Sequence, residues 1–217
     1  MRQLPWMVSC ALGTVIATGI ANSAGAEMVG YWHCNGVDPD VSTVVAASLG
    51  SGTLDFTSFG TGATIFAGTD VNGQPGVIAG DSIGLSGSSH NGSYAQIDLS
   101  TVGFADLALS FAARRSATGF GNDHVEALIG GAWTTVASFN PSTTAWGTIS
   151  IDLAALNSLE NGSASLRLYF DGATSGSGTV RFDNLTVTGT ATVPAPGAIA
   201  LLGAAAAFGR RRRRAER

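Results

Sequence analysis

The sequence predicts an all-β fold, an antiparallel β-sandwich of about ten strands. Apolar and polar residues alternate along many short segments, which is the pattern of strands that bury one face. Helical periodicity is scarce, and turn-forming dipeptides separate the segments. Two helices are expected outside this body, a signal helix at the N-terminus and a short hydrophobic helix at the C-terminus.

The strand candidates follow one another at fairly regular spacing. In chain order they are Val29–Cys34, Thr53–Thr57, Ser82–Leu85, Tyr94–Leu99, Leu107–Ala112, Val125–Ile129, Trp133–Phe139, Ile149–Ile151, Leu166–Phe170 and Thr179–Thr188. The dipeptides that suit tight hairpins are Asn72-Gly73, Asn91-Gly92, Asn161-Gly162 and Asp171-Gly172. Ala154–Leu159 is expected to form at most one helical turn. Pro39–Ser89 is rich in small residues with weak strand patterns, so its pairing is not predicted.

The last strand candidate changes phase. Apolar side chains stand at even positions in Val180–Phe182 and at odd positions in Leu185–Val187. A strand keeps both pairs on one face only with an extra residue, so we expect a β-bulge near residues 183–184. The bulge would turn the Asp183 carboxylate inward or toward the sheet edge. A partly buried carboxylate needs a cation or several donors.

The N-terminus has the pattern of a secretory signal peptide, residues 1–26. Arg2 precedes the apolar stretch Leu4–Ile20. Ala24 and Ala26 then supply small residues at the −3 and −1 positions of a cleavage site. An N-terminal membrane anchor is the alternative, which the short apolar stretch and the cleavage site disfavour.

Residues 27–189 remain as one domain, long enough for a substantial core. Between residues 27 and 193 stand four arginines and 14 acidic residues, a net charge of −10, although the whole chain carries −4. An acidic body argues against nucleic-acid binding and is compatible with divalent cations. Cys34 is the single cysteine left after signal removal, so no internal disulfide is expected. We expect it to be a buried small residue rather than a reactive thiol.

The C-terminus consists of a short linker, residues 190–193, and a tail, residues 194–217. Within the tail, residues 195–209 are apolar or small and precede five arginines. As a helix this run would span about 22 Å, short of the roughly 30 Å hydrocarbon core of a bilayer. The arginines would act as a cytoplasmic stop. A buried core helix is the alternative, but such a helix needs no polyarginine end.

This order of signals resembles the bacterial PEP-CTERM proteins. The matching residues outside the apolar run 198–208 are Val193, Pro194, Pro196, Gly197, Arg210, Arg211, Arg212, Arg213 and Arg214. Ala195 stands where the family usually carries an acid, so the match is to a Val-Pro-Ala-Pro-Gly variant. The resemblance implies that an exosortase-type membrane protease removes the tail. It also implies a transient membrane anchor and a final location in the cell envelope or extracellular matrix.

The body resembles jelly-roll domains of the carbohydrate-binding-module or laminin-G type. The stretches that carry this resemblance are Gly30–Asn35, Ser110–Phe120 and Val180–Gly189. It implies a structural Ca²⁺ held by Asp183 of the last strand and Asn35 after the first, because hard oxygen ligands suit this ion. Alternatively, Asp183 caps backbone N–H groups at the bulge or pairs with Arg181 or Arg114.

Two groups of residues are candidates for contact with a ligand. Trp32, Trp133 and Trp146 would suit an aromatic platform for sugar rings, although tryptophans in sandwich strands are more often buried. Trp133 follows a Gly-Gly turn and is the best exposed candidate. In Arg114-Arg115, a salt bridge to Asp123 or Glu126 is favoured over contact with an anion or sugar acid.

Catalytic patterns are lacking, so we do not expect an enzyme. His33, His90 and His124 are isolated, and neither an HExxH nor a GxSxG motif occurs. Acids are plentiful, but no pair is singled out as glycosidase carboxylates. Three hypotheses remain. The first is an exported, non-catalytic protein of the cell surface or exopolysaccharide layer, the second a carbohydrate-binding module with a specific glycan, and the third a secreted laminin-G-like hydrolase.

Overall fold

The computed structural model describes residues 25–192, which contain thirteen β-strands and three short 3₁₀ turns. The strands are β1 (Ala26–Trp32), β2 (Val44–Ala46), β3 (Leu49–Gly50), β4 (Thr53–Asp55), β5 (Ala63–Ala67), β6 (Asp81–Ser86), β7 (Ser93–Ser100), β8 (Phe104–Arg115), β9 (Asp123–Ile129), β10 (Ala132–Phe139), β11 (Gly147–Asp152), β12 (Ser163–Phe170) and β13 (Thr179–Ala191). The 3₁₀ turns are η1 (Thr57–Gly62), η2 (Ser88–His90) and η3 (Asn157–Leu159). The expected signal helix and the sorting tail with its hydrophobic helix lie outside the described residues.

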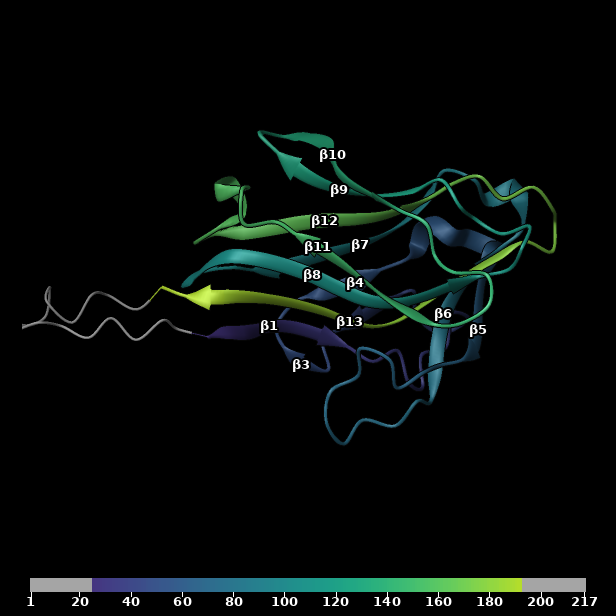
Figure 1. Ribbon diagram of the computed structural model, residues 1–217, viewed down its shortest axis with the longest axis horizontal. Coiled ribbons are helices and arrows are strands. Elements are labelled where there is room, and N and C mark those ends of the chain that lie inside the picture. Colours follow the sequence, from purple (N-terminus) through teal and green to yellow (C-terminus); the bar gives the residue numbers. More distant parts are fainter. Residues whose placement is uncertain (1–24, 193–217) are drawn as a thin grey trace, which may run out of the picture. The chain divides into compact units, whose positions relative to one another are not determined.

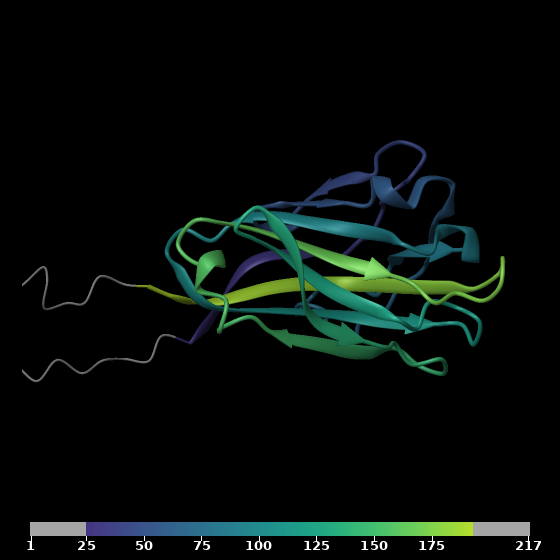
Figure 2. The ribbon, with the colours of Figure 1, turned by 90° about the horizontal axis from the view of Figure 1, so that it is seen from above.

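The strands form two antiparallel sheets that lie face to face (Figures 1 and 2). Sheet A has the order β11-β8-β13-β1-β3, and β6 joins it by pairing with β13 and with β5. Sheet B has the order β10-β9-β12-β7-β4-β2. The predicted all-β antiparallel sandwich is therefore confirmed. No helix within residues 25–192 is long and apolar enough to cross a bilayer.

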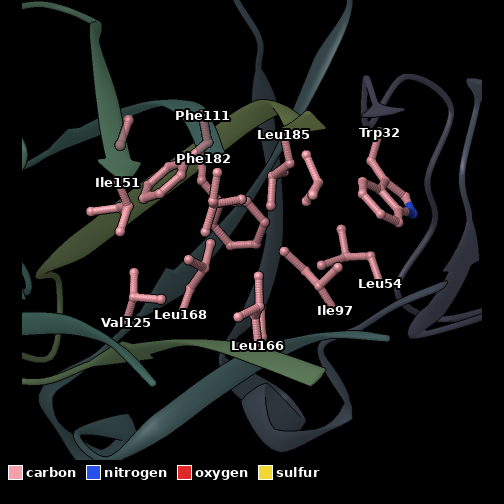
Figure 3. Packing of buried hydrophobic residues seen from close by; sticks show 14 of the residues in the cluster. Trp32, Leu54, Ile97, Phe111, Val125, Ile151, Leu166, Leu168, Phe182 and Leu185 are labelled. Carbon is pink, nitrogen blue, oxygen red and sulfur yellow. The ribbon is translucent and has the colours of Figure 1, made fainter. Parts of the chain in front are cut away.

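The core fills the space between the sheets with the side chains from one face of each strand. Figure 3 shows two opposing rows, Phe111, Phe182, Leu185 and Trp32 from sheet A, and Val125, Leu168, Leu166, Ile97 and Leu54 from sheet B. The rings of Phe170 and Phe182 stack between the sheets with centroids 5.7 Å apart. Each fully buried side chain of this size contributes about 1.5–3 kcal/mol through its transfer from water. Cys34 is buried with a free thiol, as expected.

All ten predicted strands are present, and three short ones were not predicted. β2, β3 and β5 lie within the weakly patterned Pro39–Ser89 segment. β2 and β3 are two- or three-residue strands at the sheet edges, held by backbone pairing with little side-chain burial, so they leave no alternation in the sequence. The expected helical turn at 154–159 is η3.

The predicted tight hairpins were wrong, although the four dipeptides do form turns or loops. Asn72-Gly73 lies within the long connection 68–80 between β5 and β6, and the other three stand in connections between strands that do not pair. The tight hairpin is at Gly130-Gly131 between β9 and β10. Both glycines have positive φ, 60° and 85°, as the type I′ geometry of such turns requires.

The two ends of the described chain are neighbours. β1 begins at Ala26, which pairs with Thr190 near the end of β13. Residues 190 and 191, expected to begin the linker, are still part of β13. The strand is therefore held by sheet A almost to the last described residue.

The β-bulge predicted in the last strand is confirmed. Asp183 pairs with Ala112 of β8, but the next pair is Thr186 with Ser110, so β13 has one residue more than its partner. Asn184 takes up the extra length with a φ of 50°. Because of this insertion Phe182 and Leu185 both face the core, and the side chains of Asp183 and Asn184 meet the 68–74 part of the β5–β6 connection.

Candidate functional site

The outer face of sheet B carries a cluster of aromatic and polar side chains. In β12, Leu166 and Leu168 point into the core, so Arg167 and Tyr169 point outward. The same alternation holds along the neighbouring strands. We call the resulting set the sheet B face; it comprises Trp133 of β10, His124, Glu126 and Leu128 of β9, Ser165, Arg167 and Tyr169 of β12, and Tyr94, Gln96 and Asp98 of β7.

Arg167 is the centre of the sheet B face. Its guanidinium carbon lies 3.7 Å from the ring centroid of Trp133 and 3.9 Å from that of Tyr94. Both are cation–π distances. Arg167 Nε also donates a hydrogen bond to Gln96 Oε1 at 3.0 Å, and Gln96 Nε2 donates to Asp98 Oδ2 at 2.8 Å. The guanidinium and the two rings are thus fixed with respect to one another.

A second aromatic pair extends this arrangement. The rings of His124 and Tyr169 stack with centroids 4.5 Å apart and an interplanar angle of 28°. His124 Nε2 lies 3.5 Å from Glu126 Oε1, and both side chains remain partly exposed. Leu128, paired with Trp133 across β9 and β10, is 37% exposed. The face therefore combines apolar ring surfaces with carboxylate, amide and hydroxyl groups, the combination that binds sugar rings and their hydroxyls.

The predicted ligand-binding residue Trp133 lies on this face and is partly exposed. Trp32 is fully buried, whereas Trp146 is also partly exposed and immediately precedes β11 of sheet A. The three tryptophans therefore do not form one platform. Sequence reasoning missed Tyr94 and Arg167, although the alternation of β7 and β12 already placed them outward.

Asp183, predicted to bind calcium, is fully buried beside the bulge. Its Oδ2 accepts a hydrogen bond from Thr69 N at 2.9 Å, and its Oδ1 accepts one from Asn184 N at 2.8 Å. Burial raises the pKa of Asp183 to about 7; the two N–H donors act in the opposite direction, and the charge of Asp81 adds to the increase. The carboxylate therefore caps backbone N–H groups at the bulge and pairs with neither nearby arginine.

Asn35, the second predicted ligand, fixes the other end of the β5–β6 connection. Its Oδ1 accepts a hydrogen bond from Asp81 N at 2.8 Å, and its Nδ2 donates to Ile78 O at 3.1 Å. The base of the connection is closed by Gly68 N donating to Gly80 O at 2.8 Å. Asp183 and Asn35 thus bind different parts of one loop.

A cation bound by Asp183 could be coordinated by the oxygen atoms that surround Gly68. A Cβ at this position would meet Asp183 Oδ2 at 2.6 Å and the carbonyl oxygens of Ala79 and Asp81. These donors are hard oxygens, which calcium prefers. Within residues 25–192, no group of three or more His, Cys, Asp or Glu side chains is arranged to hold a metal. A cation here would therefore depend on one carboxylate and on backbone carbonyls.

Asn184 fastens the same loop, a role that the sequence did not indicate. Tyr31 Oη donates to Asn184 Oδ1 at 2.6 Å. Asn184 Nδ2 donates to the carbonyls of Thr69 at 2.7 Å and Val71 at 3.0 Å. In the opposite direction, Asn72 Nδ2 donates a hydrogen bond to Asn184 O at 2.7 Å. The bulge is therefore the anchor of residues 69–72 on sheet A.

The favoured salt bridge of Arg114-Arg115 with Asp123 or Glu126 is not formed. Arg115 Nε instead donates to Asn140 Oδ1 at 2.9 Å. Asp123 is 2% exposed; its Oδ1 accepts from Asp171 N at 3.1 Å, and its Oδ2 has no hydrogen-bond partner. Burial raises the pKa of Asp123 to about 7, against the effect of the Asp171 N–H and the Arg115 charge. Asp123 also lines a cavity of about 430 Å³.

Comparisons with known proteins give distant structural similarities alone. No protein-family model and no curated protein matches the sequence. Among solved structures, the CBM22-1 xylan-binding domain of Paenibacillus barcinonensis Xyn10C matches with a TM-score of 0.46 and 11% identity, over 79% of this chain and 100% of that one. The CBM6cm-2 module of Cellvibrio mixtus lichenase 5A, in complex with cellotriose, matches with a TM-score of 0.42 and 12% identity, over 76% and 99%. The K2 cleaved adhesin domain of Lys-gingipain matches with a TM-score of 0.39 and 12% identity, over 63% and 87%. With TM-scores below 0.5, these similarities assign neither a ligand nor a site to this chain.

Proposed function

We propose that this is an exported, non-catalytic protein that binds polysaccharide on the sheet B face. The observation that supports it most is the fixed stack of Trp133, Arg167 and Tyr94 on a partly exposed sheet surface. Aromatic rings held in place lose little conformational freedom when a sugar ring packs on them.

The charges of the sheet B face favour a neutral, hydroxyl-rich ligand. Asp98 and Glu126 accompany the single positive charge of Arg167, so an anionic polymer would meet a net negative surface. Carboxylate oxygens are strong acceptors for sugar hydroxyls.

Two cavities of the described domain lie away from the sheet B face. The cavity of about 430 Å³ at Asp123 and one of about 540 Å³ within residues 35–46 are both lined by residues outside the sheet B face. Each is lined by one carboxylate, Asp123 or Asp38. Hydrolysis by a carboxylate pair needs two such groups across a cleft, so these cavities do not favour the hydrolase hypothesis.

The export route in this proposal rests on the sequence of the termini. The signal peptide directs the chain out of the cytoplasm, and the tail from Val193 would be read by an exosortase-type protease. The domain would then be placed in the cell-surface or exopolysaccharide layer. A structural Ca²⁺ at Asp183 remains part of the proposal.

Binding of soluble neutral polysaccharides tests the proposed function. Xylan, hydroxyethylcellulose and dextran form the probe panel, with affinity electrophoresis and calorimetry as readouts. Trp133→Ala should weaken binding to the best probe at least tenfold, roughly 1.4 kcal/mol or more. Trp146→Ala is the matched control, because it removes an indole of similar exposure next to the other sheet. Undiminished binding by folded Trp133→Ala, or equal losses in both variants, would overturn the proposal.

A further inference from the structure

Arg114 and Arg181 face one another on the outer side of sheet A. They are register partners in the pair of β8 and β13. Their neighbours Ala113 and Phe182 point into the core, so both arginine side chains point outward. Like charges directly opposite one another in a sheet are destabilising. A nearby acid or an external anion would offset this repulsion.

No acid of the described domain compensates this pair. Among the residues from 25 to 192, neither guanidinium makes a hydrogen bond or an ion pair with another side chain. Asp183, two residues from Arg181, is turned to the N–H groups of Thr69 and Asn184 instead. Two uncompensated positive charges thus stand together in a body whose net charge is −10.

The position of Arg181 is fixed by its surroundings. Its guanidinium carbon lies 3.9 Å from the ring centroid of Phe66 in β5. That ring lies against Gly84, the register partner of Arg181 in β6; a Cβ on Gly84 would meet it at 2.5 Å. Desolvation lowers the pKa of Arg181, and the charge of Arg114 lowers it further. A bound anion would reverse the second effect.

We propose that Arg114 and Arg181 bind carboxylate or sulfate groups of an acidic polysaccharide. A guanidinium presents parallel N–H donors that match both groups in bidentate geometry. The site is on the sheet opposite to the sheet B face, so it does not depend on the neutral-glycan proposal. Together the two faces would allow one domain to contact two kinds of chain.

The surroundings of the pair favour a polysaccharide over an acidic peptide. One common mode of binding for an extended peptide adds it as a strand to a free sheet edge. At the arginines, β13 is paired with β8 on one side and with β6 on the other. The other edge of β8 is paired with β11 up to Ala113, and just beyond it Arg115 N donates to Ser142 O, so this edge is also occupied. The hydroxyls of Thr64 and Ser86, 3.4 Å apart, lie on the adjoining strands and match sugar hydroxyls.

The test compares four polymers at low salt and at 0.5 M salt. Polygalacturonate supplies carboxylates, dextran sulfate supplies sulfate esters, neutral dextran supplies neither, and poly-L-glutamate is an acidic peptide. We expect polygalacturonate or dextran sulfate to bind and neutral dextran not to bind at this site, with loss of affinity at high salt. The better of the two acidic polysaccharides identifies the anion. Because the domain is acidic, non-specific attraction of a polyanion would not produce this result.

Variants separate this site from the sheet B face. Arg114→Gln and Arg181→Gln should each weaken acidic-polysaccharide binding about tenfold, and the double variant should abolish it. Arg115→Gln is the matched control, since it removes the same charge one residue away and should keep binding. Arg114→Gln is expected to keep or raise the melting temperature, because it removes like-charge repulsion. Binding that persists in the double variant, or poly-L-glutamate binding as tightly as the polysaccharides, would refute the inference whatever the outcome for Trp133→Ala.

Discussion

The phenol of Tyr31 in the first strand donates a 2.6 Å hydrogen bond to the side-chain carbonyl of Asn184 in the last strand. Tyr31 is fully buried and also accepts a bond from Gln74 N at 3.3 Å. One hydroxyl therefore joins β1, the bulge of β13 and the β5–β6 connection. Of its two hydrogen bonds, the one from Gln74 N holds the β5–β6 connection directly, and the one to Asn184 holds the bulge to which that connection is bound.

Removal of this hydroxyl should destabilise the domain. Tyr31→Phe leaves the buried Asn184 Oδ1 and the partly buried Gln74 N without their partner. The expected loss is about 1–3 kcal/mol of unfolding free energy, measured by urea unfolding. Tyr94→Phe is the control, because its ring packs on Arg167 from the outer face. Equal stability of Tyr31→Phe and the wild type would show that the network contributes nothing.

The buried carboxylate of Asp123 predicts a pH-dependent stability. Its pKa is about 7 in the folded protein against 3.8 as the ordinary value, so the folded state binds the proton more tightly. The contribution of the Asp123 carboxyl to the free energy of unfolding therefore rises as the pH falls from about 7 toward 4, and it is lowest above pH 7. Asp123→Asn should be more stable than the wild type at pH 8, by about 1–3 kcal/mol, and the advantage should shrink at pH 5.

Thermal melts at both pH values check this prediction. Asp183 has a raised pKa of about 7 as well, so Asp123→Asn should retain part of the wild-type pH dependence. A variant that is less stable than the wild type at pH 8 would mean that Asp123 Oδ2 has a stabilising partner.

Calcium binding at Asp183 can be tested by thermal melting in calcium and in chelator. A calcium concentration 100-fold above Kd should add about 2.7 kcal/mol. The increment should shrink below about pH 7, where protonation of Asp183 competes with the ion. Magnesium should act more weakly, because it demands near-ideal octahedral geometry.

Asp183→Asn and Asn35→Ala separate the two predicted ligands. Each variant is compared with itself in calcium and in chelator, so its own loss of stability does not enter. The calcium increment should vanish in Asp183→Asn and decrease in Asn35→Ala. Identical wild-type melting temperatures in calcium and chelator would rule out the ion.

Mass spectrometry of the protein from its native envelope tests the role of the tail. Removal of the segment after Val193 is expected if the exosortase-type signal is read. Ala195→Glu, which restores the usual acid, should leave processing intact or increase it. An intact Arg217 in the envelope fraction would indicate a retained anchor and contradict sorting and release.

The fold was predictable where side-chain burial alternates. In β12, for example, Leu166, Leu168 and Phe170 are buried, whereas Arg167 and Tyr169 face outward. The amino-acid sequence itself shows this alternation. The bulge was predictable for the same reason. When the alternation of apolar residues changes phase within one strand, only an inserted residue keeps all of them on the same face. β2 and β3 were not predictable, since backbone pairing at a sheet edge leaves no apolar signature.

The candidate sites needed information that no single segment contains. Trp133 was noticed on its own, but its contact with Arg167 depends on β9 and β12 lying side by side. Arg114 and Arg181 become a pair only through the order of strands in sheet A. Asp183 was identified from the change of phase in the last strand. Its hydrogen bond with Thr69, in contrast, depends on the path of the β5–β6 connection, which the sequence does not reveal.

The course of β13 has a mechanical consequence. The strand carries Arg181 near its start and reaches Ala191 at its end, next to Thr192 and the segment that follows. Tension between a polymer held at Arg181 and the C-terminal segment would be transmitted along the covalent backbone of this one strand. Because both points of attachment would lie on the same strand, its hydrogen bonds to β8 and β1 would not have to break while it carried this load. The domain is thus built to resist being pulled apart along that direction.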